Sequence, residues 1–432
     1  MQKKWIISCC FRISSIVNIH DGGNLLESNH VNTYSHRCGF TKKKTKDTMK
    51  ILFLSTPSFA DCDIPLVRAM QAKGYDVTYL LMLAPHNLQY TIIDIKKLYP
   101  KTGVFTSNVY PELKAFDGYL DMDKFFVGNR TNNKSYSLSY WKKTFDIYKF
   151  IRRNKFDIIH TPCLFGLKRL LMYFAGCKVV TTIHDPFPHT GESNRTSIQN
   201  REIAVRYSNG IILLNKKQKD QFCSFYKVNP NKLCVNKLGV YENIALMASD
   251  VKTNKKNNVL FFGRISPYKG IEYLCEAMEI VRKEIPDATL TIAGSGKLYF
   301  DIKPYLTKGY IDLQNRFIET QEIATMLKQC AICVCPYIDA TQSGVIMTSF
   351  ALSKPVIASN VGGLSEMIEE GKSGLLVEPQ NPTELANAII KLLKDPAKLD
   401  MMEAYIKESY YKGKDSWANI AETYIDFYNR II

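Results

Sequence analysis

Short apolar, β-branched runs alternate with longer amphipathic segments from Met49 onward, and a second series of such runs begins at Val259. Continuous apolar strands that alternate with helices are typical of parallel sheets covered by helices on both faces. The pattern therefore predicts an α/β protein with two Rossmann-like, doubly wound domains facing a cleft. The expected strands are 51–55, 77–81, 157–160, 179–183, 210–214, 259–263, 289–294, 332–336, 356–359 and 374–377. The expected helices include 64–73, 140–152, 271–284, 322–328 and 382–393.

The same pattern divides the chain. Residues 1–48 have no clear period and contain a basic run, so we expect a non-native or disordered extension before Met49. A signal peptide is the alternative, but Arg12 interrupts the apolar stretch and no small-residue cleavage site follows. We expect a first domain at 49–248, a polar linker at 249–258 and a second domain at 259–415. The stripe of apolar residues in 416–432 predicts a last helix that packs back on the first domain.

Charge and composition narrow the partners. The formal charge of +16 favours an anionic partner, such as a phosphorylated substrate or anionic lipid, although a solvated lysine face explains it equally well. The basic residues lack interleaved aromatics, which argues against nucleic acid. No run approaches the roughly 18 apolar residues of a membrane helix. The twelve cysteines form no disulfide pattern or zinc spacing, which favours a reducing, cytoplasmic setting.

Two segments of the second domain carry the candidate chemistry. VLFFGRISPYKG places Arg264 and Lys269 just beyond a buried strand, where two permanent donors can clamp a diphosphate and neutralise it as a leaving group without a metal. A surface pair after a strand is the alternative. YIDATQSGVIMTSFALSKPVIASNVGG puts a polar turn before an apolar helix, and backbone amides at such a turn form an anion seat. Together the segments indicate an enzyme that holds a nucleotide diphosphate and moves its sugar.

These segments also carry a resemblance. GRISPYKGIEYL, TIAGSGK and CPYIDATQSGVIMTSFALSKPVIASNVGGLSEMIEEGKSGLLVEP resemble the C-terminal domain of family 4 glycosyltransferases, also called group 1. The resemblance is close over 259–396 and looser over 49–240, through the first strand, the TIHD segment and the LGV turn. It implies the GT-B fold and a retaining transfer from a nucleotide sugar without a bound metal.

This sequence differs from that family at two positions. Its members commonly carry two glutamates, one contacting the donor sugar and one the ribose, where this sequence has Ala340 and Thr348. The variant turn ATQSG resembles a subset of members that build polysaccharides. We expect Asp339 or Gln342 to replace the sugar contact, although plain solvation of this loop is the alternative. The further donor-site candidates are Ser343, Gly344 and Val345, whose amides could face the diphosphate, and Thr348.

Other candidates follow strands. His184 and Asp185 end the TIHD segment, and the resemblance places His184 opposite the donor sugar, so both are catalytic candidates; a capped turn before proline is the alternative. His189 and Glu192 follow in a loop on the acceptor side. Gly294 and Gly296 permit close approach to the donor or simply mark a tight strand exit.

Two acidic pairs resemble metal-binding motifs. Asp61 and Asp63 are expected to cap a helix starting near Pro65, and Asp121 and Asp123 lie in an irregular region. We therefore expect no metal and no cofactor beyond the donor.

The sequence thus predicts a glycosyltransferase that uses a nucleotide-sugar donor and a glycan or lipid-linked acceptor in surface polysaccharide or lipopolysaccharide biosynthesis. The aromatic, lysine-rich stretch 136–155 could contact an anionic membrane at the inner face of the cytoplasmic membrane, or be an amphipathic core helix. A sugar-nucleotide epimerase of the same fold and a non-catalytic sugar-nucleotide-binding partner remain the alternatives.

Overall fold

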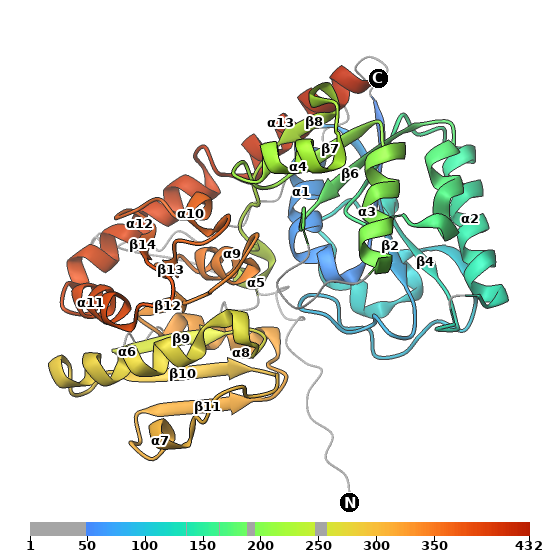
Figure 1. The fold of residues 1–432 in the computed structure, drawn as a ribbon. Coiled ribbons are helices and arrows are strands. Elements are labelled where there is room, and N and C mark those ends of the chain that lie inside the picture. Colours follow the sequence, from blue (N-terminus) through green and yellow to red (C-terminus); the bar gives the residue numbers. More distant parts are fainter. Residues whose placement is uncertain (1–48, 135, 164, 188–194, 247–256) are drawn as a thin grey trace, which may run out of the picture. The chain divides into compact units, whose positions relative to one another are not determined.

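The computed structural model describes residues 49–134, 136–163, 165–187, 195–246 and 257–432 (Figure 1). The expected extension at 1–48, most of the expected linker, and the candidates His189 and Glu192 lie outside these ranges. None of the helices in the described ranges is both long and apolar enough to cross a membrane.

The first domain is built on a sheet that has eight strands within the described residues, in the order β3-β4-β2-β1-β5-β6-β7-β8. All neighbouring strands are parallel except the edge pair β3 and β4, which is antiparallel. The strands are β1 (Lys50–Ser55), β2 (Asp76–Leu83), β3 (Gly103–Thr106), β4 (Phe125–Asn129), β5 (Ile158–Thr161), β6 (Lys178–Ile183), β7 (Gly210–Leu213) and β8 (Leu233–Val235).

Helices cover this sheet on both faces (Figure 1). Beyond their first residues, its central strands β1 and β2 are buried and mostly apolar, which is what a doubly covered parallel sheet requires. The α-helices are α1 (Ala60–Ala72), α2 (Leu138–Asn154), α3 (Arg195–Tyr207), α4 (Lys219–Tyr226) and α5 (Glu242–Leu246). Short 3-10 helices are η1 (Pro57–Phe59), η2 (Ser107–Val109), η3 (Pro111–Phe116), η4 (Met122–Lys124), η5 (Leu167–Phe174) and η6 (Pro230–Lys232).

The second domain has a parallel sheet of six strands in the described residues, in the order β11-β10-β9-β12-β13-β14. Its strands are β9 (Asn258–Phe262), β10 (Thr289–Gly294), β11 (Ile311–Asn315), β12 (Ile332–Cys335), β13 (Val356–Ser359) and β14 (Gly374–Val377). Its helices are η7 (Pro267–Lys269), α6 (Ile271–Glu284), α7 (Lys303–Leu306), α8 (Thr320–Gln329), α9 (Gly344–Ala351), α10 (Leu364–Met367), α11 (Pro382–Leu393) and α12 (Pro396–Tyr411).

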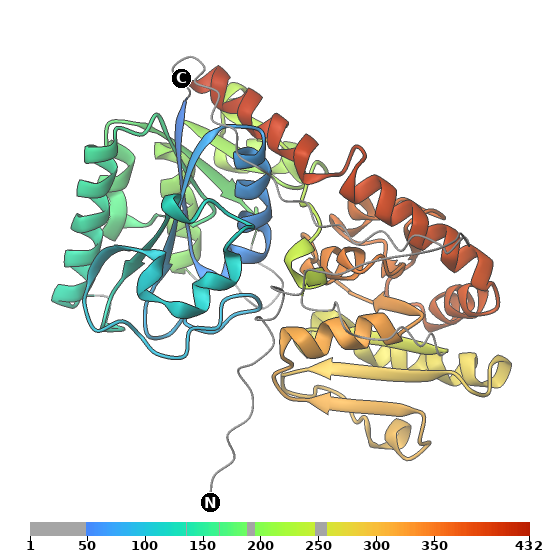
Figure 2. The same cartoon turned by 180° about the vertical axis from the view of Figure 1, so that it is seen from behind.

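The last helix, α13 (Trp417–Ile431), packs against α1 of the first domain, as Figure 2 shows for the red and blue helices. One stripe of α13 is buried, and its polar groups find partners in the first domain. Trp417 donates from Nε1 to the carbonyl oxygen of Val240 at 2.7 Å. Tyr428 and His160 share a hydrogen bond of 2.6 Å between the hydroxyl and Nδ1.

The predicted fold class is confirmed, and every strand expected from the sequence is present within two residues of its expected bounds. The prediction that Asp61 and Asp63 cap a helix near Pro65 is wrong, because α1 begins at Ala60 and both carboxylates lie in its first turn. The sequence pattern missed β3, β4, β8 and β11, which are short or interrupted by glycine and polar residues and so lack a long apolar run.

Candidate active site

The exit of β9 carries the first two predicted residues. Arg264 is exposed, and the chain then turns through η7, which ends at Lys269. The ammonium nitrogen of Lys269 lies 3.5 Å from the centroid of the Tyr337 ring and 5.0 Å from that of Tyr268. A cation over an aromatic face is held by the ring quadrupole, so Tyr337 fixes where this charge lies.

Tyr337 also contacts the second motif, which contains the ATQSG turn and the start of α9. The Ser343 hydroxyl lies 3.4 Å from the Tyr337 hydroxyl and forms a hydrogen bond with it. Ser343 is the N-cap residue of α9, but its side chain makes no capping bond. The amides of Gly344 and Val345 belong to the first turn of α9, where helix geometry leaves N–H groups without intrahelical partners. Lys269, Tyr337 and Ser343 therefore bring the two sequence motifs to one edge of the sheet.

The two predicted glycines, Gly294 and Gly296, lie where the exits of β9 and β10 cross. Gly294 has φ +152°, and a Cβ there would lie 1.8 Å from the carbonyl oxygen of Gly263. A Cβ on Gly296 would lie 2.0 Å from the carbonyl oxygen of Ile265. Backbone packing alone thus requires glycine at both positions, independently of any ligand.

The catalytic candidates follow β6 in the first domain. The His184 ring is half-buried and stacks on Phe59 with centroids 4.7 Å apart. Burial lowers the pKa of His184 to about 4, against a smaller opposing effect of Asp185, so the imidazole is neutral near pH 7. Asp185 accepts a hydrogen bond from the Thr341 hydroxyl. The histidine segment is therefore tied directly to the ATQSG turn of the second domain.

Four further hydrogen bonds join the ATQSG turn and α10 to the exit of β7. Asn215 donates from Nδ2 to the carbonyl oxygen of Thr341 at 3.0 Å. Gln342 donates from Nε2 to the carbonyl oxygen of Leu214 at 2.5 Å. The Glu366 carboxylate accepts from the backbone amides of Lys216 and Lys217 at 2.8 and 2.6 Å. No role is predicted for Thr341 or Asn215 from the sequence; the position of Asn215 directly after an apolar strand was the available signal.

The remaining donor candidates differ in exposure. Asp339 and Val345 are half-buried, whereas Thr348 is buried within α9. Ala340, the other position where the family commonly has glutamate, is also buried, and its carbonyl oxygen would lie 1.7 Å from a Cβ on Gly362. The structure therefore places Thr348 in packing contact and leaves Asp339 nearer to solvent.

In the first acidic pair, Asp63 is buried and Asp61 is half-buried. Burial raises the pKa of both Asp61 and Asp63 to about 7. Asp63 accepts a hydrogen bond from the Ser55 hydroxyl. Asp121, in the second pair, accepts from the backbone amide of Asp123 at 3.1 Å and so caps η4. Among the described residues no group of three or more potential metal ligands is present.

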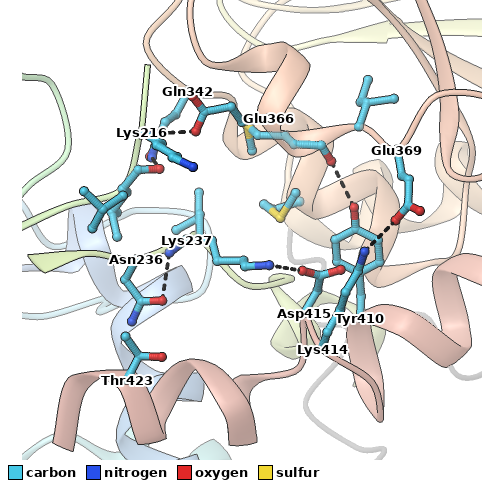
Figure 3. Close-up of a pocket in the computed structure, with 16 residues that line it drawn as sticks. Lys216, Asn236, Lys237, Gln342, Glu366, Glu369, Tyr410, Lys414, Asp415 and Thr423 are labelled. Atoms are coloured by element: carbon cyan, nitrogen blue, oxygen red, sulfur yellow. Dashed lines mark hydrogen bonds and ion pairs between the residues drawn. The ribbon is translucent and has the colours of Figure 1, made fainter. Parts of the chain in front are cut away.

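A cavity of about 510 Å³ lies beside Gln342, bounded by the exits of β7 and β8 and by α10, α12 and α13 (Figure 3). At one end, Glu366 and Lys216 lie together with Gln342. At the other end, Lys237 pairs with Asp415, and Lys414 pairs with Glu369 at 2.9 Å. Its lining does not include Lys269 or Tyr337, so this cavity is separate from their cluster.

Comparison with known families gives two matches. Residues 65–242 match the model described as Glycosyltransferase Family 4, and residues 256–395 match the model described as Glycosyl transferases group 1.

Individual proteins show the same relationship. A glycosyltransferase of unassigned role from Methanocaldococcus jannaschii is 29% identical over 236 residues, which cover 50% of this chain and 59% of that protein. The chain therefore spans little more than half of that relative. The UDP-Gal:alpha-D-GlcNAc-diphosphoundecaprenol alpha-1,3-galactosyltransferase of Escherichia coli is 26% identical over 340 residues, 74% of this chain and 85% of its own length. The solved structure of Anabaena HepE in complex with UDP superimposes with a TM-score of 0.60 at 18% identity, covering 88% of this chain and 99% of HepE, which supports the shared fold.

Proposed function

Because the chain belongs to the group 1 glycosyltransferases, with a first domain of the family 4 type, we propose that it transfers a sugar from a nucleotide diphosphate to a glycan or lipid-linked acceptor. The observation that carries the donor site is the Lys269–Tyr337–Ser343 cluster, which joins a positioned cation to the start of α9. A diphosphate beside that cluster would meet both a fixed positive charge and helix amides.

In this proposal, Arg264 and Lys269 stabilise the negative charge that develops on the leaving diphosphate. Arg264 is exposed and offers a planar fork, whereas Lys269 is held in place by Tyr337. The amides of Gly344 and Val345 add hydrogen bonds from the start of α9, and Asp339 contacts the sugar. No metal is needed for charge neutralisation in this arrangement, which stays a prediction.

His184 and Asp185 act at the sugar. A neutral imidazole can exchange hydrogen bonds with sugar hydroxyls without adding a charge beside the anomeric carbon. Asp185 holds this segment against the ATQSG turn through Thr341. The reaction retains the anomeric configuration when the leaving phosphate accepts the proton of the attacking hydroxyl on the same face of the sugar.

The proposals for the acceptor and the cellular setting rest on similarity to a relative that is 26% identical. The name of the Escherichia coli relative specifies a lipid-linked sugar diphosphate as acceptor, and a similar acceptor here would place the reaction in polysaccharide or lipopolysaccharide assembly. The solvent-exposed face of α2 favours binding to the cytoplasmic face of a membrane. Trp141 and Phe145 are exposed there, and the Lys149 ammonium lies 4.5 Å from the Phe145 ring centroid.

The donor site can be tested with the full-length chain and UDP-, GDP- and ADP-sugars. A donor that binds the folded state raises the melting temperature in proportion to the logarithm of its concentration over its dissociation constant. We expect a shift with one nucleotide class that is lost in Arg264→Ala and Lys269→Ala but kept in Lys283→Ala, an exposed lysine at the end of α6. No shift with any of the three classes would contradict the proposal.

Product analysis then separates the activities. Transfer gives free nucleoside diphosphate and a new glycosidic bond whose anomeric configuration NMR can assign. An epimerase would instead change the sugar without an acceptor, and a non-catalytic partner would bind the donor without turnover. Either result would overturn the transferase assignment while leaving the donor site intact.

A further inference from the structure

Two arginines lie over the Tyr140 ring at the carboxyl edge of the first sheet, and the cation of Lys143 lies near them. Arg130 follows β4 directly, Lys143 lies in α2 and Arg169 lies in η5. The guanidinium carbons of Arg130 and Arg169 lie 5.3 and 5.8 Å from the centroid of the same Tyr140 ring. The Lys143 ammonium donates to the carbonyl oxygen of Leu83, the last residue of β2, at 3.3 Å.

This cluster lies on the edge of the sheet that also carries His184. The strands β2, β4, β5 and β6 are parallel, so their carboxyl ends share one edge, where ligands of such sheets bind. Cys163, just beyond β5, contacts Thr56 through its thiol at 3.8 Å, and Thr56 directly precedes η1, whose Phe59 stacks on His184.

Among the described residues, the cluster has no negatively charged partner of the kind that buried cations require. Arg130 is 6% exposed and Lys143 is 3% exposed. Nε and Nη1 of Arg130 are buried without any hydrogen-bond partner. Within the described ranges, no aspartate or glutamate forms an ion pair with any of the three cations. Burial, with Arg169 as the next cause, lowers the pKa of both Lys143 and Arg130.

Unpaired buried charge of this kind is strongly unfavourable, and folded proteins normally pair it. Packing around Tyr140 could be the whole reason for the two arginines, but it leaves the buried nitrogens of Arg130 unsatisfied. A bound anion would satisfy them and offset the mutual repulsion of the three cations. Two guanidinium groups and an ammonium suit a phosphate, whose oxygens accept from several donors at once.

We propose that Arg130, Lys143 and Arg169 bind a phosphate group of the acceptor. This step rests on the proposed transferase function, because it assigns the first domain to the acceptor and the second to the donor. The phosphate could belong to a soluble sugar phosphate or to a lipid-linked one, since the chemistry of recognition is the same. The acceptor would then be anionic, and its phosphate would orient the hydroxyl that attacks the donor sugar.

The first test measures binding of inorganic phosphate and pyrophosphate by calorimetry. The full-length Arg264→Ala/Lys269→Ala variant serves as background, so that the donor site cannot account for the signal. We expect binding in this background that weakens by about tenfold or more on adding Arg130→Gln or Arg169→Gln. Arg153→Gln, an exposed arginine at the end of α2, is the matched control and should bind as the background does. No binding in the background, or equal binding in all variants, would overturn the proposal.

The second test uses the sign of a stability change, which separates a ligand site from a packing role. Without phosphate, Arg130→Met removes an unpaired buried charge, so its melting temperature should equal or exceed that of the parent. With phosphate, the parent should gain stability and Arg130→Met should not. A variant that is destabilised in the absence of phosphate and still shifts with it would assign Arg130 to packing alone and refute the site.

The third test identifies the source of the phosphate. Glucose 1-phosphate in solution is compared with phosphatidylcholine vesicles that contain a polyprenyl phosphate. Arg130-dependent binding of either probe supports the site and names the acceptor type; binding of neither would refute the acceptor role. Donor binding and donor hydrolysis by the parent are measured in parallel, because neither requires the acceptor. If no probe binds but the parent turns over the donor, the phosphate site is refuted and the transferase function stands. If the parent does not turn over the donor, the transferase function itself is contradicted.

Discussion

The ammonium nitrogen of Lys269 lies 3.5 Å from the centre of the Tyr337 ring, although the two residues come from the exits of different strands. Tyr337 is fully buried, so its ring cannot follow a movement of the lysine. The hydroxyl at the far side of the ring reaches Ser343 at the start of α9. One aromatic side chain thus sets the distance between a cation and a helix terminus.

Replacing Tyr337 should weaken donor binding. Cation–π contacts contribute about 0.5–2 kcal/mol, so Tyr337→Leu should raise the KM for the donor about 2- to 30-fold. Tyr337→Phe keeps the ring and should have a smaller effect. Steady-state kinetics at a temperature well below unfolding measures both. Tyr310→Leu provides the control, because Tyr310 lies under Arg282 at 5.1 Å elsewhere in the domain. An unchanged KM in Tyr337→Leu would remove the tyrosine from the donor site.

The buried carboxylate of Asp63 should make a contribution to stability that falls as pH rises. The pKa of Asp63 is raised from 3.8 to about 7, so between these values the unfolded chain releases a proton that the folded protein keeps. The contribution of Asp63 to the free energy of unfolding therefore decreases from about pH 4 to about pH 7 and then levels off. The lowered pKa values of His160 and His184 act in the opposite direction over much of this range. The effect of Asp63 is therefore measured as the stability of the parent relative to Asp63→Asn, which should fall from about pH 4 to about pH 7.

Melting temperatures from pH 4 to pH 8 test this. Asp312→Asn, which changes an exposed carboxylate on β11, should follow the parent curve. A stability difference between the parent and Asp63→Asn that stays constant from pH 4 to pH 8 would contradict the raised pKa of Asp63.

The contact between Tyr428 and His160 should stabilise the docking of α13. His160 is buried, its Nε2 lies 2.8 Å from the Thr182 hydroxyl, and burial lowers its pKa to about 3. Tyr428→Phe leaves Nδ1 of this neutral ring without its partner, which costs about 1–3 kcal/mol.

Urea unfolding measures that cost. Tyr310→Phe is the matched control, because the Tyr310 hydroxyl is buried and makes no hydrogen bond, so its removal should be close to neutral. Equal losses in the two variants would show that the hydroxyl of Tyr428 contributes nothing specific.

The outer face of α2 should bind anionic membranes. The change is Trp141→Ser with Phe145→Ser, which removes exposed aromatic surface and leaves the buried face of the helix intact. We expect reduced co-sedimentation with vesicles that contain phosphatidylglycerol and no binding to pure phosphatidylcholine in either protein. Phe225→Ser, an exposed aromatic on α4, is the control. Equal sedimentation of all three proteins would argue against this surface.

The sequence by itself determined the fold class, and it predicted Arg264 and Lys269 as donor-binding residues. Buried parallel strands are rich in consecutive apolar residues, so β1 and β13 were visible in the pattern. Edge strands such as β11 pair on one side and keep polar residues, and no local signal separates them from loops. Helix starts were equally uncertain, because buried carboxylates in the first turn of α1 look like caps in a sequence.

The relations between distant residues were decided by the tertiary structure. Tyr337 between Lys269 and Ser343, Thr341 on Asp185, and the cations around Tyr140 come from different elements of the chain. The hydrophobic pattern and the spacing of motifs indicate local secondary structure and burial. These contacts depend instead on the order of the strands and on which loops the sheets bring to one edge. Whether a buried charge has a partner is likewise a property of three-dimensional packing, and the unpaired nitrogens of Arg130 became visible only there.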